Sequence, residues 1–124
     1  MTSRILAIED DRGIRVVLER GLRLAGHDLV LAETLALARA AWTSDDAYDL
    51  VLLDVMLPDG DGLALLRERR AAGDATPTVL LTAREEAELG ERAADAGADA
   101  YLPKPFAYRD LLACIDRFAG SGPA

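Results

Sequence analysis

Short apolar runs alternate with longer amphipathic stretches along the whole chain, and this alternation is the feature that most constrains the fold. Five strand–helix repeats of this kind predict an α/β domain, with a parallel sheet covered by helices on both faces. The third run, Leu50 to Leu53, is apolar at every position, as expected of a central strand buried on both sides. The predicted strands are residues 4–8, 28–33, 49–54, 78–82 and 99–102, and the predicted helices are residues 12–25, 34–44, 61–71, 85–96 and 106–118.

Polar side chains stand at the ends of four of the five predicted strands. The first strand is followed by the acids Glu9, Asp10 and Asp11, the third ends in Asp54, the fourth ends in Thr82, and Lys104 follows the fifth. If these strands are parallel, all of these groups meet at the carboxyl edge of one sheet, where open α/β sheets bind their ligands.

Carboxylates gathered with a lysine and a hydroxyl indicate chemistry on a metal and a phosphoryl group. Crowded carboxylates repel one another unless a cation neutralises them, and Mg²⁺ prefers oxygen ligands. A carboxylate can also act as a nucleophile and form an aspartyl phosphate, for which Asp54 is the best candidate because it ends the central strand. Lys104 and Thr82 are suited to contact phosphoryl oxygens.

Each of these residues also has an ordinary structural interpretation when it is taken alone. Acids after the first strand favour the N-terminus of the following helix, and an aspartate such as Asp54 commonly opens a turn. Thr82 has a high strand propensity, and a lysine before a proline is usually a solvated surface residue. The combination of all four at one sheet edge favours the functional interpretation.

Charge and cysteine content restrict the partners and the compartment. Acidic residues outnumber basic ones 22 to 14, which gives a net charge of −8 and argues against nucleic-acid binding by this segment. No apolar run approaches the ~20 residues that a membrane span needs. The single Cys114 fits a reducing, cytoplasmic setting. Residues 120–124 are small and are expected to form a flexible tail or the start of a linker.

Four segments with this spacing resemble the response-regulator receiver domains of bacterial two-component systems, and the resemblance covers nearly all of residues 3–118. The sequence around Asp54 and Lys104 is most similar to that of receivers that precede a winged-helix DNA-binding domain. The resemblance implies a receiver domain at residues 1–119, with a flavodoxin-like doubly wound (βα)5 fold and strand order 2-1-3-4-5. The four segments are IleLeuAlaIleGluAspAsp at 5–11, LeuAspValMetLeuProAspGlyAspGly at 53–62, LeuThrAlaArg at 81–84 and GlyAlaAspAlaTyrLeuProLysProPhe at 97–106.

The resemblance also implies a role for each site residue. Asp54 would be the phosphoacceptor, and Mg²⁺ would be bound by Asp10, Asp54 and the backbone carbonyl of Met56, with Glu9 acting through water. Thr82, Lys104 and the backbone N–H of Ala83 would bind the phosphoryl group. Thr82 and Tyr101 would form a switch pair that alters the face made by the fourth helix, the fifth strand and the fifth helix. The peptide bond between Lys104 and Pro105 would be cis.

The partners implied are a sensor histidine kinase and a C-terminal DNA-binding effector domain, and the alternative is a stand-alone regulator that acts through protein contacts. Such a domain is a phosphoacceptor with autophosphorylation and autodephosphorylation chemistry, not a turnover enzyme. Winged-helix relatives commonly dimerise through paired charges, but Gly90, Glu91, Ala100 and Cys114 depart from that pattern. We therefore expect a monomer or a weak homodimer.

Two other classes share part of this pattern. A flavin-binding protein would need a cradle rich in hydroxyls and glycines after the first strand, where this chain has three acids. An aspartyl-phosphate hydrolase would place a second aspartate two residues after the nucleophile, where this chain has Met56, which cannot donate a proton.

Overall fold

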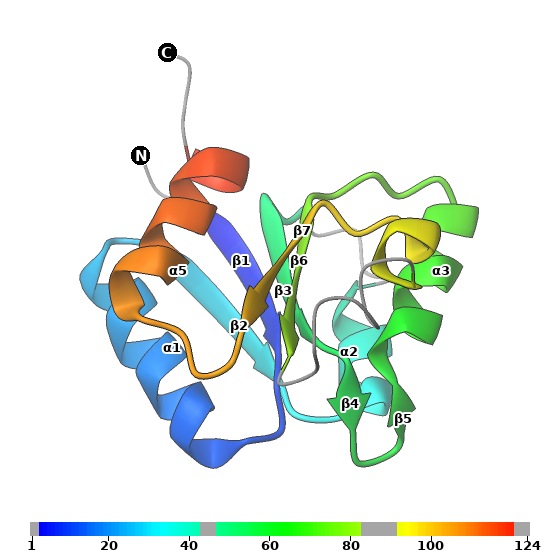
Figure 1. The fold of residues 1–124 in the computed structure, drawn as a ribbon, viewed down its shortest axis with the longest axis horizontal. Helices are drawn as coiled ribbons and strands as arrows, with labels where there is room; N and C mark the ends of the chain where they lie inside the picture. Colours follow the sequence, from blue (N-terminus) through cyan, green and yellow to red (C-terminus); the bar gives the residue numbers. More distant parts are fainter. Residues whose placement is uncertain (1–2, 43–46, 83–91, 121–124) are drawn as a thin grey trace.

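A five-stranded parallel sheet forms the centre of the molecule (Figure 1). The computed structural model describes residues 3–42, 47–82 and 92–120. The strand order is β2-β1-β3-β6-β7, which confirms the expected doubly wound order because β4 and β5 form a separate hairpin outside the sheet. The sheet strands are β1 (Arg4–Ile8), β2 (Asp28–Ala32), β3 (Leu50–Asp54), β6 (Thr78–Thr82) and β7 (Ala100–Pro103).

Helices cover both faces of the sheet. On one face lie α1 (Arg12–Leu24) and α5 (Tyr108–Ile115), and on the other lie α2 (Leu35–Trp42), α3 (Gly62–Ala71) and a helical segment at residues 92–96 (Figure 1). Alternate residues of β3 point to opposite cores: Leu50 and Leu52 pack with α1 and α5, whereas Val51 and Leu53 pack with α2 and α3. All four are fully buried, as predicted for a central strand.

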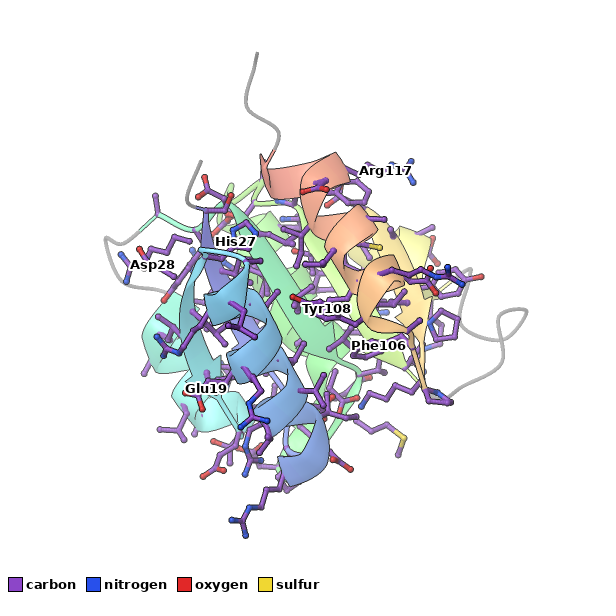
Figure 2. All side chains as sticks on the ribbon, turned by 90° about the vertical axis from the view of Figure 1, so that its left-hand side faces the viewer. Glu19, His27, Asp28, Phe106, Tyr108 and Arg117 are labelled. Carbon is purple, nitrogen blue, oxygen red and sulfur yellow. The ribbon has the colours of Figure 1, made fainter. Side chains whose placement is uncertain are left out.

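The two helices on the first face touch closely near the N-terminus of α5. Figure 2 shows Tyr108 and Phe106 lying beside α1, and the Tyr108 hydroxyl donates to the carbonyl oxygen of Gly21 at 2.7 Å. A Cβ atom at position 21 would meet the Tyr108 ring at 2.4 Å, so glycine is required for this approach. The contact fixes the start of α5, and with it the segment that follows β7.

Several predicted boundaries shift by one to three residues. The predicted helix at 106–118 begins later, at Tyr108, because Ala107 is extended (ψ 145°) and precedes the first turn. It ends at Ile115 and continues as a π-helical turn over Asp116–Gly120. The second helix begins at Leu35, where the Thr34 hydroxyl accepts the N–H of Leu37 at 3.1 Å. Residues 43–44 and 85–91 of two predicted helices lie outside the described residues.

A short antiparallel hairpin, which the sequence analysis did not predict, follows β3. Its strands are β4 (Met56–Leu57) and β5 (Gly60–Asp61). Asp59, at its tip, accepts hydrogen bonds from the first two N–H groups of α2, at 2.7 and 3.1 Å. Asp61 caps α3 by accepting the Leu63 N–H at 2.8 Å and pairs with Arg92 at 2.8 Å. The hairpin is therefore held by three helical segments and forms a fixed wall beside the end of β3.

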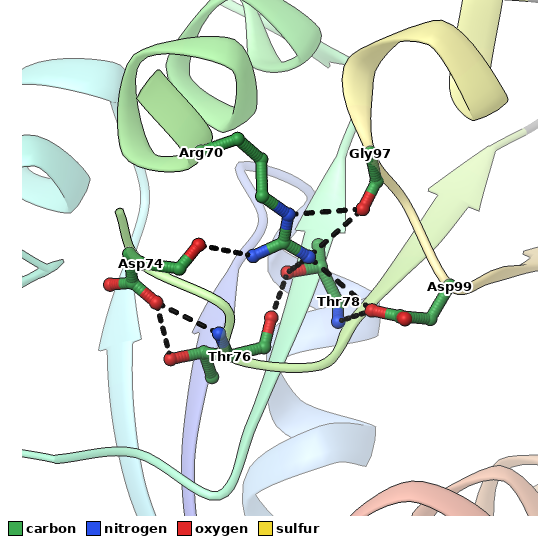
Figure 3. A network of polar contacts seen from close by, with 6 residues as sticks. All are labelled: Arg70, Asp74, Thr76, Thr78, Gly97 and Asp99. Atoms are coloured by element: carbon green, nitrogen blue, oxygen red, sulfur yellow. Dashed lines mark hydrogen bonds and ion pairs between the residues drawn. The ribbon is translucent and has the colours of Figure 1, made fainter. Parts of the chain in front are cut away.

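Arg70 ties the opposite, amino-terminal edge of the sheet together (Figure 3). Its guanidinium donates twice to the carbonyl oxygen of Gly97, at 3.1 and 2.9 Å, and once to the carbonyl oxygen of Asp74 at 3.0 Å. It also reaches Asp99, whose carboxylate accepts the N–H of Thr78 at 2.8 Å. This network joins the end of α3 to the segments that lead into β6 and β7.

Candidate functional site

The carboxyl edge of the sheet brings together the side chains that the sequence predicted there. Asp54 is the last residue of β3 and Thr82 the last of β6, while Glu9 follows β1 and Lys104 follows β7. Three of these four polar residues are buried: Glu9 is fully buried, and Asp54 and Thr82 are only 6% and 2% exposed. Parallel strands with a common register explain this convergence, because Ile8 pairs with Leu53 and Asp54 pairs with Leu81.

Lys104 forms ion pairs with both buried carboxylates. Its Nζ lies 2.6 Å from Glu9 Oε1 and 3.4 Å from Asp54 Oδ2. The backbone N–H of Lys104 donates to the carbonyl oxygen of Thr82 at 2.7 Å, which fixes the start of the β7–α5 connection. The peptide bond between Lys104 and Pro105 is cis. One ammonium thus offsets part of the charge of two acids that share a site screened from water.

The backbone after β3 holds the Asp54 carboxylate from the other side. Its Oδ1 accepts the Met56 N–H at 3.2 Å, and the Gly62 N–H donates to the carbonyl oxygen of Val55 at 2.7 Å. The start of α3 comes so close to β3 that a Cβ atom on Gly62 would lie 2.2 Å from the carbonyl oxygen of Asp54. Gly62 is therefore a site residue that the sequence analysis missed.

Burial and charge change the protonation of this site. Burial raises the pKa of Asp54 to about 7, and a hydrogen bond and the charge of Glu9 act in the same direction. The Lys104 charge and the Met56 N–H oppose the rise without cancelling it. Burial lowers the pKa of Lys104, but Glu9 and Asp54 outweigh it and leave that pKa above its ordinary value. The site favours a cation, since a second positive charge would relieve the repulsion between the acids.

Three carboxylates are arranged so that they could share a metal ion. Glu9, Asp10 and Asp54 each offer an oxygen, and these oxygens all lie within 4.8 Å of one another. Two of the residues are buried and Asp10 is exposed, so the cluster opens to solvent on one side. Hard oxygen donors with one open side suit Mg²⁺, which keeps several waters when it binds protein. The residues present therefore fit the predicted metal.

The third acid of the loop after β1 has a different role. Asp11 caps α1, because its Oδ1 accepts the N–H of Ile14 at 3.0 Å. Its own N–H donates to Glu9 Oε2 at 3.1 Å, which orients the buried carboxylate. The simple capping interpretation is thus correct for Asp11, whereas Glu9 and Asp10 point into the cluster.

The remaining predicted residues lie around this centre. Tyr101 is half-buried in β7 and packs against the core on the α2 and α3 face. The Met56 side chain is 60% exposed at the rim of the site. Ala83, proposed to contribute a backbone N–H, lies outside the described residues, as do Gly90 and Glu91. Within the described part of the chain, no helix has the length and apolar character needed to cross a membrane.

Comparisons with known proteins agree with this geometry. The family model of the response regulator receiver domain matches residues 5–116. Response regulator MprA of Mycobacterium leprae is 44% identical over 112 residues, which are 90% of this chain and 49% of that protein. MprA of Mycolicibacterium vanbaalenii is 45% identical over 115 residues, covering 91% and 48%. The chain therefore spans about half the length of the curated relatives it matches.

Solved structures show the same fold. The receiver domain of the Francisella response regulator 1452 superposes with a TM-score of 0.87 at 27% identity, covering 94% of this chain and 95% of that one. DrrB of Thermotoga maritima, an OmpR/PhoB homologue, superposes with a TM-score of 0.82 at 31% identity, covering 95% and 52%. On the family match and the fold together, the chain belongs to the response-regulator receiver domain family.

Proposed function

We propose that this receiver accepts a phosphoryl group on Asp54 from a phosphohistidine of a sensor histidine kinase, in a reaction that depends on Mg²⁺. The observation that carries the proposal is the meeting of Asp54, Glu9 and Lys104 in one nearly buried cluster at the carboxyl edge of the sheet. The family match and the acidic cluster support it.

The reaction requires Asp54 in its ionised form. A carboxylate oxygen of Asp54 attacks the phosphorus, the bond between phosphorus and the histidine nitrogen breaks, and the nitrogen keeps the electron pair. Mg²⁺, held by the carboxylates of Asp10 and Asp54 and the carbonyl of Met56, with Glu9 acting through water, would supply charge neutralisation for the acids and the phosphoryl oxygens. Because the pKa of Asp54 is raised to about 7 without a metal, a bound cation increases the fraction that can react.

Lys104 and Thr82 serve the phosphoryl group after transfer. The Lys104 ammonium already lies 3.4 Å from the Asp54 carboxylate and would form an ion pair with the oxygens of the transferred phosphoryl group. The Thr82 hydroxyl, at the end of β6, would donate to another oxygen, and the backbone N–H of Ala83 would assist. Phosphorylated Asp54 carries about two negative charges in place of the one on its carboxylate, so Mg²⁺ and the Lys104 ammonium would both interact more strongly with the site than before.

We propose that Thr82 and Tyr101 transmit the modification. The Thr82 hydroxyl moves toward the phosphoryl group, and the half-buried ring of Tyr101 turns inward into the space that the hydroxyl leaves. The output then appears on the face formed by the segment at 85–96, β7 and α5. Such a switch needs only a local change that biases two packings of the same residues.

On this proposal the domain is a phosphoacceptor with autophosphorylation and autodephosphorylation chemistry and not a turnover enzyme. Its proposed location is the cytoplasm. The matched MprA proteins are about twice as long as this chain, which supports its being the receiver part of a transcriptional regulator with a DNA-binding effector domain. The alternative is a stand-alone regulator that acts through protein contacts.

Intact-mass spectrometry tests the proposal. Incubation with a small-molecule phosphodonor and Mg²⁺ is expected to add one phosphate to the wild-type protein and none to Asp54→Asn. Chelation of Mg²⁺ is expected to prevent the addition. Equal labelling of Asp54→Asn would show that the acceptor is another residue.

A further inference from the structure

Arg15 reaches from α1 to the backbone of the metal-binding loop. Its Nη1 donates to the carbonyl oxygen of Asp10, while its Nη2 lies 3.2 Å from the carboxylate of Glu33, which follows β2. The Arg15 backbone N–H also donates to the carbonyl oxygen of Asp11 at 2.9 Å. The side chain is only 22% exposed, compared with 56% for Arg23 on the same helix. One guanidinium therefore bridges the ends of two adjacent strands.

Asp10 is the member of the acidic cluster that most needs such support. Glu9 is buried and paired with Lys104, and Asp54 is held by Lys104 and by the Met56 N–H. Asp10 is exposed, and the place of its carboxylate depends on the backbone that carries it. A ligand with an unfixed backbone loses conformational freedom on binding a metal, and this loss weakens the binding.

We propose that Arg15 is a positioning residue for metal binding: by clamping the Asp10 carbonyl against Glu33, it places the Asp10 carboxylate for the cation. The inference rests on the proposed function, because it assumes that Mg²⁺ binds at Glu9, Asp10 and Asp54. A planar guanidinium can donate to two separate acceptors at once, which an ammonium does less well.

The sign of the effect separates positioning from simple electrostatics. Arg15 is a cation beside a cation site, so its charge alone opposes Mg²⁺ binding. If charge were its only influence, removing it would tighten Mg²⁺ binding. If it positions Asp10, removing it weakens Mg²⁺ binding in spite of the lost repulsion. A role in fold stability alone would leave the Mg²⁺ affinity of the folded protein unchanged.

The experiment is a Mg²⁺ titration of the whole chain followed by the amide chemical shifts of residues 9–14, without any phosphodonor. The proteins are wild type, Arg15→Met, Arg15→Lys and the control Arg23→Met. Arg23→Met removes the same charge from the same helix, and Arg23 is paired only weakly with Glu19, at 3.6 Å. Asp10→Asn serves as the reference for a lost ligand.

We expect Arg15→Met to bind Mg²⁺ about 3- to 10-fold more weakly, at or below the low end of the roughly 10- to 100-fold cost of removing groups that orient metal ligands, because Arg15 holds the backbone of Asp10 and not its carboxylate. Arg15→Lys keeps the charge but is expected to bind about as weakly as Arg15→Met, because one ammonium does not hold both acceptors. Arg23→Met is expected to change the affinity by less than about 2-fold, given the screening of exposed charges.

Each result has a distinct meaning. Unchanged or tighter binding in Arg15→Met overturns the proposal, and so does wild-type affinity in Arg15→Lys. If Arg15→Met fails to fold, Arg15→Lys decides. Wild-type protein that binds no Mg²⁺, or binds it equally after Asp10→Asn, overturns the metal site of the proposed function as well. Wild-type binding that is lost in Asp10→Asn but insensitive to Arg15 overturns the positioning role alone.

Discussion

Replacing the buried carboxylate of Asp54 with an amide is expected to stabilise the metal-free protein at neutral pH. Burial, together with Glu9, raises the pKa of Asp54 from 3.8 to about 7. At a pH between these two pKa values, Asp54 is protonated in the folded protein but has lost its proton in the unfolded chain. The free energy of unfolding therefore falls as pH rises through this range, because the folded state binds more protons than the unfolded state.

The expected size follows from the two pKa values. Each pH unit of difference corresponds to ~1.4 kcal/mol, so the whole shift sets a ceiling of about 4 kcal/mol at high pH. About 1–2 kcal/mol of this is already present near pH 5, because the unfolded chain is mostly ionised there. The stability of Asp54→Asn relative to wild type is therefore expected to grow by about 2–3 kcal/mol between about pH 5 and about pH 8.

Urea unfolding in a chelating buffer at several pH values measures this difference. The matched control is Asp28→Asn, an exposed aspartate at the start of β2 that is labelled in Figure 2. Saturating Mg²⁺ is expected to stabilise wild type much more than Asp54→Asn at the higher pH, because it binds the ionised site of the folded state. A stability difference that does not grow with pH, or that shrinks, would refute the reasoning about this carboxyl group.

Further predictions concern the surroundings of the site. Gly62→Ala is expected to destabilise the fold by about 1–3 kcal/mol, because a Cβ atom would lie 2.2 Å from the carbonyl oxygen of Asp54. The midpoint of thermal unfolding should fall, and an unchanged midpoint would contradict this. Thr82→Ala is expected to leave the fold intact but reduce the chemical-shift changes along residues 92–106 on phosphorylation, and switching like wild type would disprove its role. Sedimentation velocity is expected to find a monomer or weak dimer at micromolar concentration, because Ala100 and Cys114 cannot form the usual ion pair; a tight dimer without phosphodonor would show that another contact suffices.

The sequence predicted the sheet, its helices and the meeting of the candidate site residues at one sheet edge, because these depend on the strand–helix repeats along the chain. The apolar run at Leu50–Leu53 marked the central strand, and the order of the sheet placed Asp54 and Lys104 at one edge. Parallel strands then dictate the convergence, with little dependence on the detail of the loops.

The contacts that the sequence did not predict join residues far apart along the chain. Asp59 caps a helix that begins 24 residues earlier, and Asp61 pairs with Arg92 from 31 residues away. The need for Gly62 arises from the distance between two packed elements, which no local pattern records. In the sequence Arg15 is one of several charged residues of α1, and nothing local marks its contact with the carbonyl oxygen of Asp10.

The chemical identity of the phosphorylated residue tests the central claim most directly. Borohydride reduces an acyl phosphate to an alcohol, so treatment of the phosphorylated protein is expected to convert Asp54 to homoserine, identified by peptide mass spectrometry. The conversion is expected to require both Mg²⁺ and phosphodonor and to leave Asp10 and Glu9 unchanged. Conversion of another acid, or a phosphate that resists borohydride on a hydroxyl side chain, would contradict the assignment of Asp54 as the phosphoacceptor.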